Sequence, residues 1–266
     1  MRIALQILVC LNHQDLILMP EWKDMTILLS SKPFGETGML VSVLSKNNGR
    51  YKSFVHGGNS IKKRSIFQKG NICNAEWKAR ISDQMGSIKL ELVSSTATNF
   101  FNLPIQLTAL SAVCEISDYI LPEREPNQNI FIATINLFEL LKLSNGLNFD
   151  WVKGYVKWEI GLLSELGFSL KLQECAVNGK RENLSFVSPK TGRAVSYNEG
   201  LPYKDKLLVL PKFLGGINNS TCLISDLILG LNLTKYFLNF NFYNNNSISP
   251  SRIRLEKQLQ KKIIQA

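Results

Sequence analysis

Hydrophobic residues recur at every second position in the first third of the chain and at helical spacing after it, and this change of period limits the possible folds most. The clearest alternation is at 72–80, where Cys73, Ala75 and Trp77 are separated by polar residues. Such alternation is typical of half-buried β-strands. Five runs separated by turn residues are Met25–Ser30, Gly38–Leu44, Arg50–His56, Ile72–Arg80 and Ile88–Leu92. They predict a small closed barrel of the OB type, although an SH3-like barrel would give much the same pattern.

From Pro104 onward the apolar spacing becomes helical, and Pro104 itself suits a first helical position. Three amphipathic stretches joined by short links predict a compact helical bundle. The region after Leu172 has many Gly and Pro breakers and two further helical stretches. We therefore expect an α+β protein with a five-stranded OB-type domain at 20–97, a helical domain at 98–172 and a small C-terminal module at 173–266.

Residues 1–19 form an apolar N-terminal extension. The run Ile3–Leu11 follows Arg2 and superficially resembles a signal peptide, but it lacks a second basic residue and a small-x-small cleavage site. Translation starting at Met19 is the simpler explanation, so this extension need not be part of the native protein.

The net charge of +10 and the isoelectric point near 9.4 indicate a polyanionic partner, either nucleic acid or an acidic membrane surface. The net charge is +6 over residues 21–94, −3 over 95–173 and +7 over 174–266, so two basic zones flank an acidic middle. No apolar run is long enough to cross a bilayer. The five cysteines include no Cys-x-x-Cys pair, which indicates reduced thiols in a cytoplasmic protein.

Motifs that would indicate catalysis are scarce. The chain has two histidines, His13 and His56, and neither a Gly-x4-Gly-Lys-Ser/Thr phosphate loop nor a Gly-x-Gly-x-x-Gly segment that opens a helix. A hydrolase that uses His56 stays an alternative, but nothing near His56 in the sequence supports it. We expect no enzyme activity and no cofactor.

One strand of the predicted barrel carries a pattern that suits nucleic acid. Its period of two places four side chains on one face, namely Arg50, Lys52, Phe54 and His56. Cations neutralise phosphates and a flat ring stacks on a base, which together bind single strands. The alternative is a half-exposed strand in which Phe54 belongs to the core.

Basic residues continue after this strand. Lys62, Lys63 and Arg64 follow two glycines, Lys69 comes soon after, and Lys78 and Arg80 extend the basic surface along the next outward face. A continuous cationic band is the usual electrostatic footprint of nucleic-acid binding, whereas the alternative is a set of solvated loops. Trp77 alternates with small buried residues, so we expect it in the core.

The order of these features resembles the RecO family of bacterial recombination mediators. The resemblance rests on Gly35-Glu36-Thr37, on Asn48-Gly49-Arg50 and the strand into Gly57-Gly58, on Leu163–Phe168 with Cys175–Gly179, and on Phe186–Val195. It covers roughly residues 20 to 240. It implies an OB barrel, a helical middle and a C-terminal module.

The resemblance also implies a function in DNA repair and recombination. Members bind single- and double-stranded DNA, anneal complementary strands, and act with RecR to load a recombinase onto strands coated by single-strand-binding protein, whose acidic C-terminal tail they engage. A cytoplasmic, nucleoid-associated location follows. The DNA-contact positions that carry over are Arg50, Lys52, Lys62, Lys63 and Arg64.

The chain departs from the zinc-binding members of the family. Cys175 stands where a first ligand would, but Asn178 replaces the second, and residues 192–197 contain no cysteine. One thiolate cannot hold a structural zinc, so we expect no metal. Other functions left open are an OB-fold RNA-binding protein and a scaffold that docks its helices on a partner.

Overall fold

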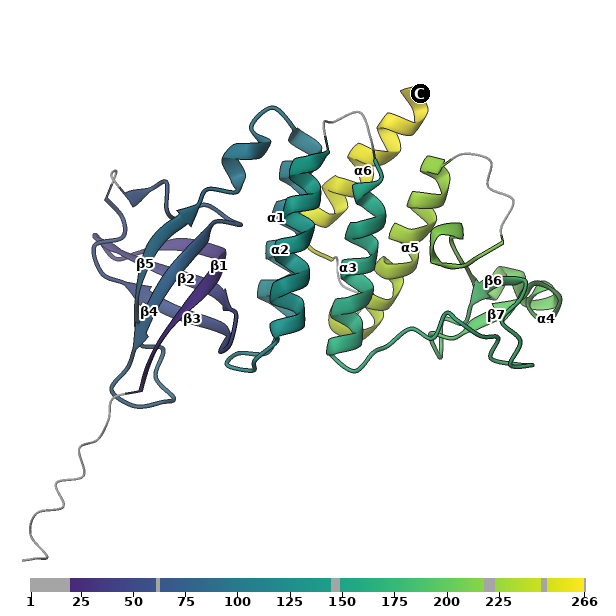
Figure 1. Cartoon of the computed structure of the whole chain (residues 1–266), viewed down its shortest axis with the longest axis horizontal. Coiled ribbons are helices and arrows are strands. Elements are labelled where there is room, and N and C mark those ends of the chain that lie inside the picture. Colours follow the sequence, from purple (N-terminus) through teal and green to yellow (C-terminus); the bar gives the residue numbers. More distant parts are fainter. Residues whose placement is uncertain (1–19, 61–62, 145–148, 218–222, 245–247, 266) are drawn as a thin grey trace, which may run out of the picture.

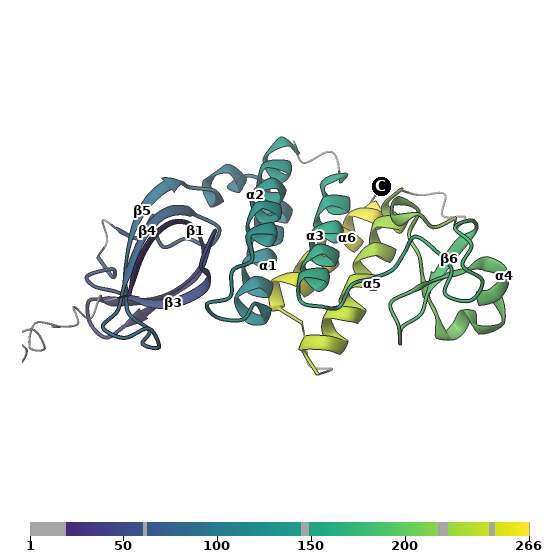
Figure 2. The ribbon, with the colours of Figure 1, turned by 60° about the horizontal axis from the view of Figure 1, so that its bottom comes forward.

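The computed structural model describes residues 20–60, 63–144, 149–217, 223–244 and 248–265. A β-barrel lies at one end of an elongated molecule, a helical bundle lies in the middle, and a small mixed module lies at the other end (Figure 1; Figure 2). No helix within the described ranges is long and apolar enough to span a membrane. The α+β class predicted from the sequence is confirmed.

Five strands close the barrel in the order β1-β2-β3-β5-β4, and β4 returns to pair with β1. Neighbouring strands are antiparallel except β3 and β5, which are parallel and share only the pair Phe54 and Ser87. This order is that of the OB fold, a partly open Greek-key barrel, so the OB-type prediction is confirmed over the SH3-like alternative. The strands are β1 (Glu21–Phe34), β2 (Gly38–Ser45), β3 (Gly49–Val55), β4 (Ile72–Lys78) and β5 (Ser87–Ser94).

The middle of β1 is buried on both faces because this strand separates two cores. Leu28 points into the barrel core together with Trp77. Ile27 and Leu29 point the other way and belong to the core of the helices. Successive residues of a strand face opposite sides, so one uninterrupted apolar run fixes the barrel to the bundle.

The bundle is built from two separate stretches of chain. The last two of its long helices follow the small module in sequence, yet they pack on α1 and α3 in one continuous core. The final basic helix buries Leu255 and Leu259 while Lys257 and Lys261 stay exposed.

The boundaries expected for the three domains stay predictions. The long helices are α1 (Pro104–Ile120), α2 (Gln128–Leu143), α3 (Trp151–Glu165), α5 (Leu223–Phe242) and α6 (Pro250–Gln265), and the 3₁₀ helix η2 (Ala97–Phe100) precedes α1.

A buried ion pair fixes α6 to the rest of the bundle. The Nε atom of Arg252 lies 2.6 Å from Oε1 of Glu159 on α3, and both side chains are fully buried. Thr234 on α5 donates a further hydrogen bond to Glu159, and Nη2 of Arg252 donates to the carbonyl oxygen of Leu231 at 2.9 Å. Three helices therefore meet at one charged centre, which joins the two stretches of the bundle.

The small module contains a three-stranded sheet in the order β7-β6-β8. Cys175 is buried beside it, and its sulfur accepts a hydrogen bond from the backbone N–H of Ser196 at 3.3 Å. The elements of the module are β6 (Leu184–Val187), β7 (Ala194–Ser196), α4 (Tyr197–Gly200), η3 (Leu201–Lys206), β8 (Leu208–Val209) and η4 (Lys212–Leu214). The sequence predicted an irregular region here, because such short strands carry little periodicity.

Candidate nucleic-acid interface

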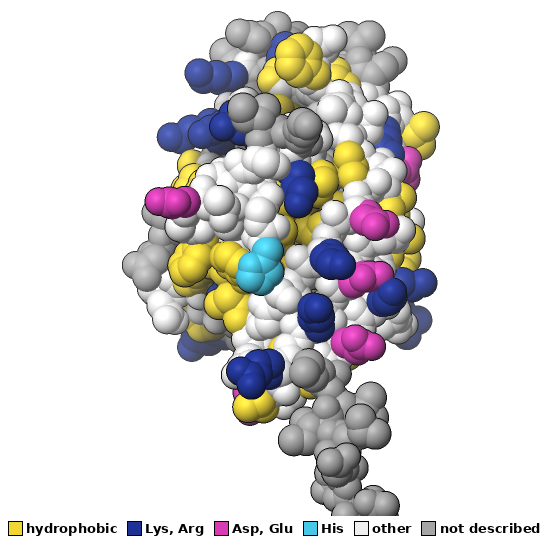
Figure 3. All heavy atoms as spheres, turned by 90° about the vertical axis from the view of Figure 1, so that its left-hand side faces the viewer, with side chains coloured by type: hydrophobic (Ala, Val, Ile, Leu, Met, Phe, Trp, Pro, Cys, Tyr) yellow, Lys and Arg dark blue, Asp and Glu magenta, His cyan; other side chains and the backbone are white. Residues whose placement is uncertain are grey.

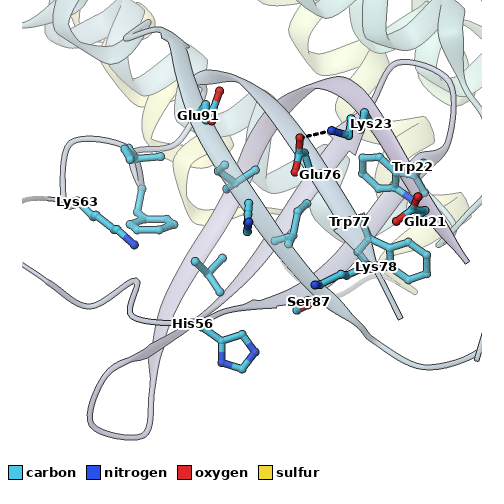
Figure 4. A pocket seen from close by; sticks show the side chains of 16 residues that line it. Glu21, Trp22, Lys23, His56, Lys63, Glu76, Trp77, Lys78, Ser87 and Glu91 are labelled. Atoms are coloured by element: carbon cyan, nitrogen blue, oxygen red, sulfur yellow. Dashed lines mark ion pairs between the residues drawn. The ribbon is translucent and has the colours of Figure 1, made fainter. Parts of the chain in front are cut away.

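A groove with a volume of ≈ 940 Å³ opens in the barrel where β3 and β5 separate beyond their single shared pair. Its floor is apolar and includes Val55, Trp77 and Ile88 from the barrel core. Its rim is charged, and the side chains that line it are drawn in Figure 4. A cleft of this kind can hold a chain whose charged backbone follows the rim while its less polar parts meet the floor.

Three residues predicted from the sequence meet at this groove. His56 follows β3, Lys63 lies in the next loop, and Lys78 ends β4. Figure 4 shows the three side chains around the same opening. Lys89 on β5 also lines the groove, although it was not among the residues predicted from the sequence. Its outward position could have been predicted, because Ile88 and Leu90 point inward on either side of it.

Carboxylates line the other part of the rim. Oε1 of Glu76 lies 2.5 Å from Nζ of Lys23, and this contact lowers the pKa of Glu76 and raises the pKa of Lys23. Glu21 and Glu91 are the other acidic members of the rim. The positive side of the groove is therefore the side that carries His56.

The four remaining basic side chains of the rim lack a carboxylate partner. His56, Lys63, Lys78 and Lys89 form no ion pair with any residue that the structure describes. Figure 3 looks onto the barrel end of the molecule and shows lysine or arginine side chains near the histidine, interspersed with acidic side chains, and hydrophobic side chains on the other side of the histidine. A phosphate that approaches this face meets lysines without a direct ion pair, although the charges of Lys78 and Lys89 also help to lower the pKa of Glu76.

Arg50 does not lie on the exposed face that the sequence predicted, and its position is a correction. It is 7% exposed, and its Nε donates to the carbonyl oxygen of Leu121 at 2.7 Å. Its Nη1 lies 3.4 Å from Glu123 and 3.6 Å from Asp118. The segment after α1 covers the start of β3, so Arg50 joins the barrel to the helices.

Two other predicted contacts already have acidic partners. Lys52 lies 2.9 Å from Glu123, and the hydrogen bond between them lowers the pKa of Glu123. Lys69 lies 2.8 Å from Glu115 on α1. Burial alone would raise the pKa of Glu115, but hydrogen bonds from Lys69 and Ser251 bring it below its ordinary value. DNA would have to compete with these carboxylates for Lys52 and Lys69.

The predicted aromatic residue of β3 is neither fully exposed nor part of the deep core. Phe54 is half-buried, and its ring meets the rings of Phe34 and His56 edge-to-face with centroids 5.7 Å and 4.6 Å away. Phe34 was not among the predicted contacts, because Lys32-Pro33-Phe34-Gly35 reads as a break after the strand Met25–Ser30. The strand β1 instead continues to Phe34.

The structure also shows whether the remaining residues singled out from the sequence are exposed or buried. Arg64 and Arg80 are exposed, whereas Lys62 lies outside the described residues. Trp77 is buried as predicted, and its Nε1 donates to the carbonyl oxygen of Met85 at 3.0 Å. Among the described residues no group of three or more His, Cys, Asp or Glu side chains is placed to hold a metal ion.

Comparison with known proteins identifies the family. The model of the recombination protein O N-terminal domain matches residues 19–96, and the model of the C-terminal domain matches residues 104–254. The chain belongs to the RecO family. A DNA repair protein RecO from Rhodospirillum centenum is 43% identical over 225 residues, which cover 84% of this chain and 87% of that protein.

Further RecO relatives match over similar lengths. The protein from Rhodospirillum rubrum is 39% identical and aligns with 83% of this chain and 88% of its own length. The protein from Granulibacter bethesdensis is 38% identical, with 88% of this chain and 94% of its own length aligned. Membership of the RecO family assigns this chain a role in DNA repair and recombination.

Proposed function

We propose that this RecO protein binds single- and double-stranded DNA through the barrel groove, anneals complementary strands, and helps to load a recombinase onto strands coated by single-strand-binding protein. The observation that carries the proposal is the set of unpaired basic side chains, His56, Lys63, Lys78 and Lys89, around an apolar-floored groove. OB barrels bind oligonucleotides on the face of strands 2 and 3 and on the loops that flank it. Val55 at the end of β3 lines the groove, and the other strand residues that line it belong to β1, β4 and β5.

Electrostatic attraction would supply most of the affinity. Each phosphate that a lysine or arginine neutralises releases condensed counterions, which gives a log–log salt slope of about −0.7 per contact for a single strand. Annealing follows from the same charges, because a cationic surface screens the repulsion between two strands held near each other. The expected partners are DNA, RecR and the acidic tail of single-strand-binding protein.

The proposal includes no covalent chemistry. His56 is exposed and packs against the ring of Phe54, and it has no hydrogen-bonded carboxylate or hydroxyl partner among the described side chains. A general base needs such an orienting partner to act on a nucleophile. We therefore favour a binding role for His56 over the hydrolase alternative.

Reversing two charges of the groove rim, Lys63 and Lys78, together with the exposed Arg64 next to Lys63 in sequence tests the proposal. The variant Lys63→Glu/Arg64→Glu/Lys78→Glu should bind single-stranded DNA about 100-fold more weakly at ~0.1 M salt, because three phosphate contacts are lost. It should also anneal oligonucleotides coated with single-strand-binding protein much more slowly. The measurements are fluorescence anisotropy for affinity and the rate of duplex formation for annealing.

A matched control carries the same change in charge at a distance from the barrel. Lys157→Glu/Lys257→Glu/Lys261→Glu alters exposed lysines on α3 and α6. It should keep most of the affinity and the annealing rate. Equal losses in both triple variants would show that total charge matters and would remove the groove from the proposal. Stronger binding of RNA than of DNA in competition would favour an RNA-binding role instead.

A further inference from the structure

Three aromatic side chains form a ridge beside the positive side of the groove, and we call Phe34, Phe54 and His56 the aromatic ridge. Phe34 ends β1 and is 60% exposed, although a phenyl ring in water is unfavourable. Figure 3 shows hydrophobic side chains gathered beside the histidine on this face. Because His56 also lines the groove, the ridge and the groove are continuous.

The backbone holds the ridge in place. Phe34 and Gly38 are paired across the turn between β1 and β2. A Cβ atom at Gly38 would collide with the ring of Phe54, so the glycine lets this ring lie directly over β2. Phe54 in turn meets Phe34 edge-to-face. The exposed ring thus packs edge-to-face on a second ring beside the turn between β1 and β2, which reduces the entropy that the Phe34 side chain would lose on binding a ligand.

The position of the ridge matches the place where an OB barrel meets a strand. Phe34 lies next to the turn between β1 and β2. Phe54 lies on β3, and its backbone N–H donates a hydrogen bond to the carbonyl oxygen of Gly86 in the turn between β4 and β5. Nucleic acids bind OB barrels across strands 2 and 3 and between these two turns. Lys78 pairs with Ser87, Ser87 pairs with Phe54, and Phe54 contacts Phe34, so a strand whose phosphates meet Lys78 would pass near Phe34.

We propose that Phe34, supported by Phe54 and His56, stacks on an unpaired nucleobase and so makes the barrel bind single-stranded DNA more tightly than duplex DNA. This inference rests on the proposed function and adds the chemical basis of strand selection. A ring can stack on a base of a single strand, because its face is free. In a duplex the faces are covered by neighbouring base pairs, so only the phosphates remain for the cations of the groove.

Two substitutions of Phe34 separate stacking from simple apolar contact. Phe34→Leu keeps an apolar side chain but removes the aromatic ring, whereas Phe34→Trp keeps a stacking ring. The probes are a labelled oligothymidylate and a labelled duplex of the same length. Phe34→Leu should weaken binding of the single strand by about 5- to 100-fold, the range expected for one stacked base, and change duplex affinity by less than about twofold.

The tryptophan variant supplies a direct signal. Phe34→Trp should keep the affinity of the wild type for the single strand, and the fluorescence of the new indole should be quenched when the oligothymidylate binds. The ratio of affinities between wild type and Phe34→Leu should also be independent of salt, because stacking releases no counterions. Phe101→Leu is the matched control, since Phe101 is 86% exposed but lies after η2, beyond the barrel strands.

The outcomes distinguish this inference from the proposed function. Unchanged single-strand affinity in Phe34→Leu, together with weak binding by Lys63→Glu/Arg64→Glu/Lys78→Glu, would overturn the stacking site and leave the groove in place. Equal loss of single-strand and duplex affinity in Phe34→Leu would also overturn it. If the charge-reversed variant bound DNA like the wild type, the proposed function itself would fail.

Discussion

At the scale of single residues, the buried pair Arg252 and Glu159 shows how a basic side chain can serve the fold instead of the surface. Both groups are fully buried; Glu159 accepts a further hydrogen bond from Thr234 of α5, and Nη2 of Arg252 donates to the carbonyl oxygen of Leu231, whereas Nη1 of Arg252 has no hydrogen-bond partner among the described residues. The ring of Tyr155 lies beneath the guanidinium group, with its centroid 5.6 Å away. Such a pair contributes little net stability as a whole, but the loss of one partner leaves an uncompensated buried charge.

Arg252→Met should therefore destabilise the protein by about 3–5 kcal/mol. The measurement is urea unfolding followed by tryptophan fluorescence, since Trp151 and Trp158 lie in the same bundle. Arg254→Met removes an exposed arginine two residues away and should cost less than ~0.5 kcal/mol. Similar unfolding free energies for the two variants would contradict the role assigned to the buried pair.

The sequence predicted some residues of the candidate site and missed others for a physical reason. Alternation correctly assigned Trp77 to the core and placed Lys78 on the opposite face of β4. Alternation says which face a residue lies on, but not what covers that face. Arg50 was misplaced because a segment some seventy residues later in the chain packs over it.

At the scale of elements, the segment after α1 links the barrel to the bundle. Arg124 adopts a positive φ of 64° and donates hydrogen bonds to the carbonyl oxygens of Ser82 and Gln84. Its guanidinium group also lies 5.4 Å from the ring centroid of Tyr51. Glu125 of the same segment approaches the turn between β2 and β3 so closely that a side chain at Gly49 would overlap with its backbone.

Gly49→Ala should therefore destabilise the protein by about 2–4 kcal/mol, because it combines a positive φ of 81° with a backbone collision. Gly35→Ala is the control, since Gly35 has a similar φ of 63° but open space around it. It should cost only about 1 kcal/mol. Thermal unfolding of both variants checks the difference, and equal losses would show that the contact with Glu125 is unimportant.

The sequence predicted the elements better than their partners. Periodicity located the five barrel strands and the first three helices, because each buries one regular face. It could not show that α6 packs on α1, since an apolar stripe does not identify the stripe that covers it. The extension of β1 to Phe34 was missed because Pro33 and Gly35 are typical strand breakers.

At the scale of the whole molecule, the net charge of the chain differs between the barrel and the first helices of the bundle. The barrel region and the C-terminal region are basic, whereas the stretch that contains α1, α2 and α3 is acidic. Part of this acidity is used within the fold, because Glu115, Asp118 and Glu123 lie against cations of the barrel. These contacts reduce the number of barrel cations available to DNA and leave those of the groove.

The central claim is that cations of the barrel groove bind DNA by neutralising its phosphates. The most direct test is the dependence of single-strand affinity on salt concentration, measured for the wild type, for Lys63→Glu/Arg64→Glu/Lys78→Glu and for Lys157→Glu/Lys257→Glu/Lys261→Glu. We predict a log–log slope of about −3 for the wild type and the control, and a slope about 2 units shallower for the groove variant. A wild-type slope near zero, or one that the groove variant shares, would contradict the claim.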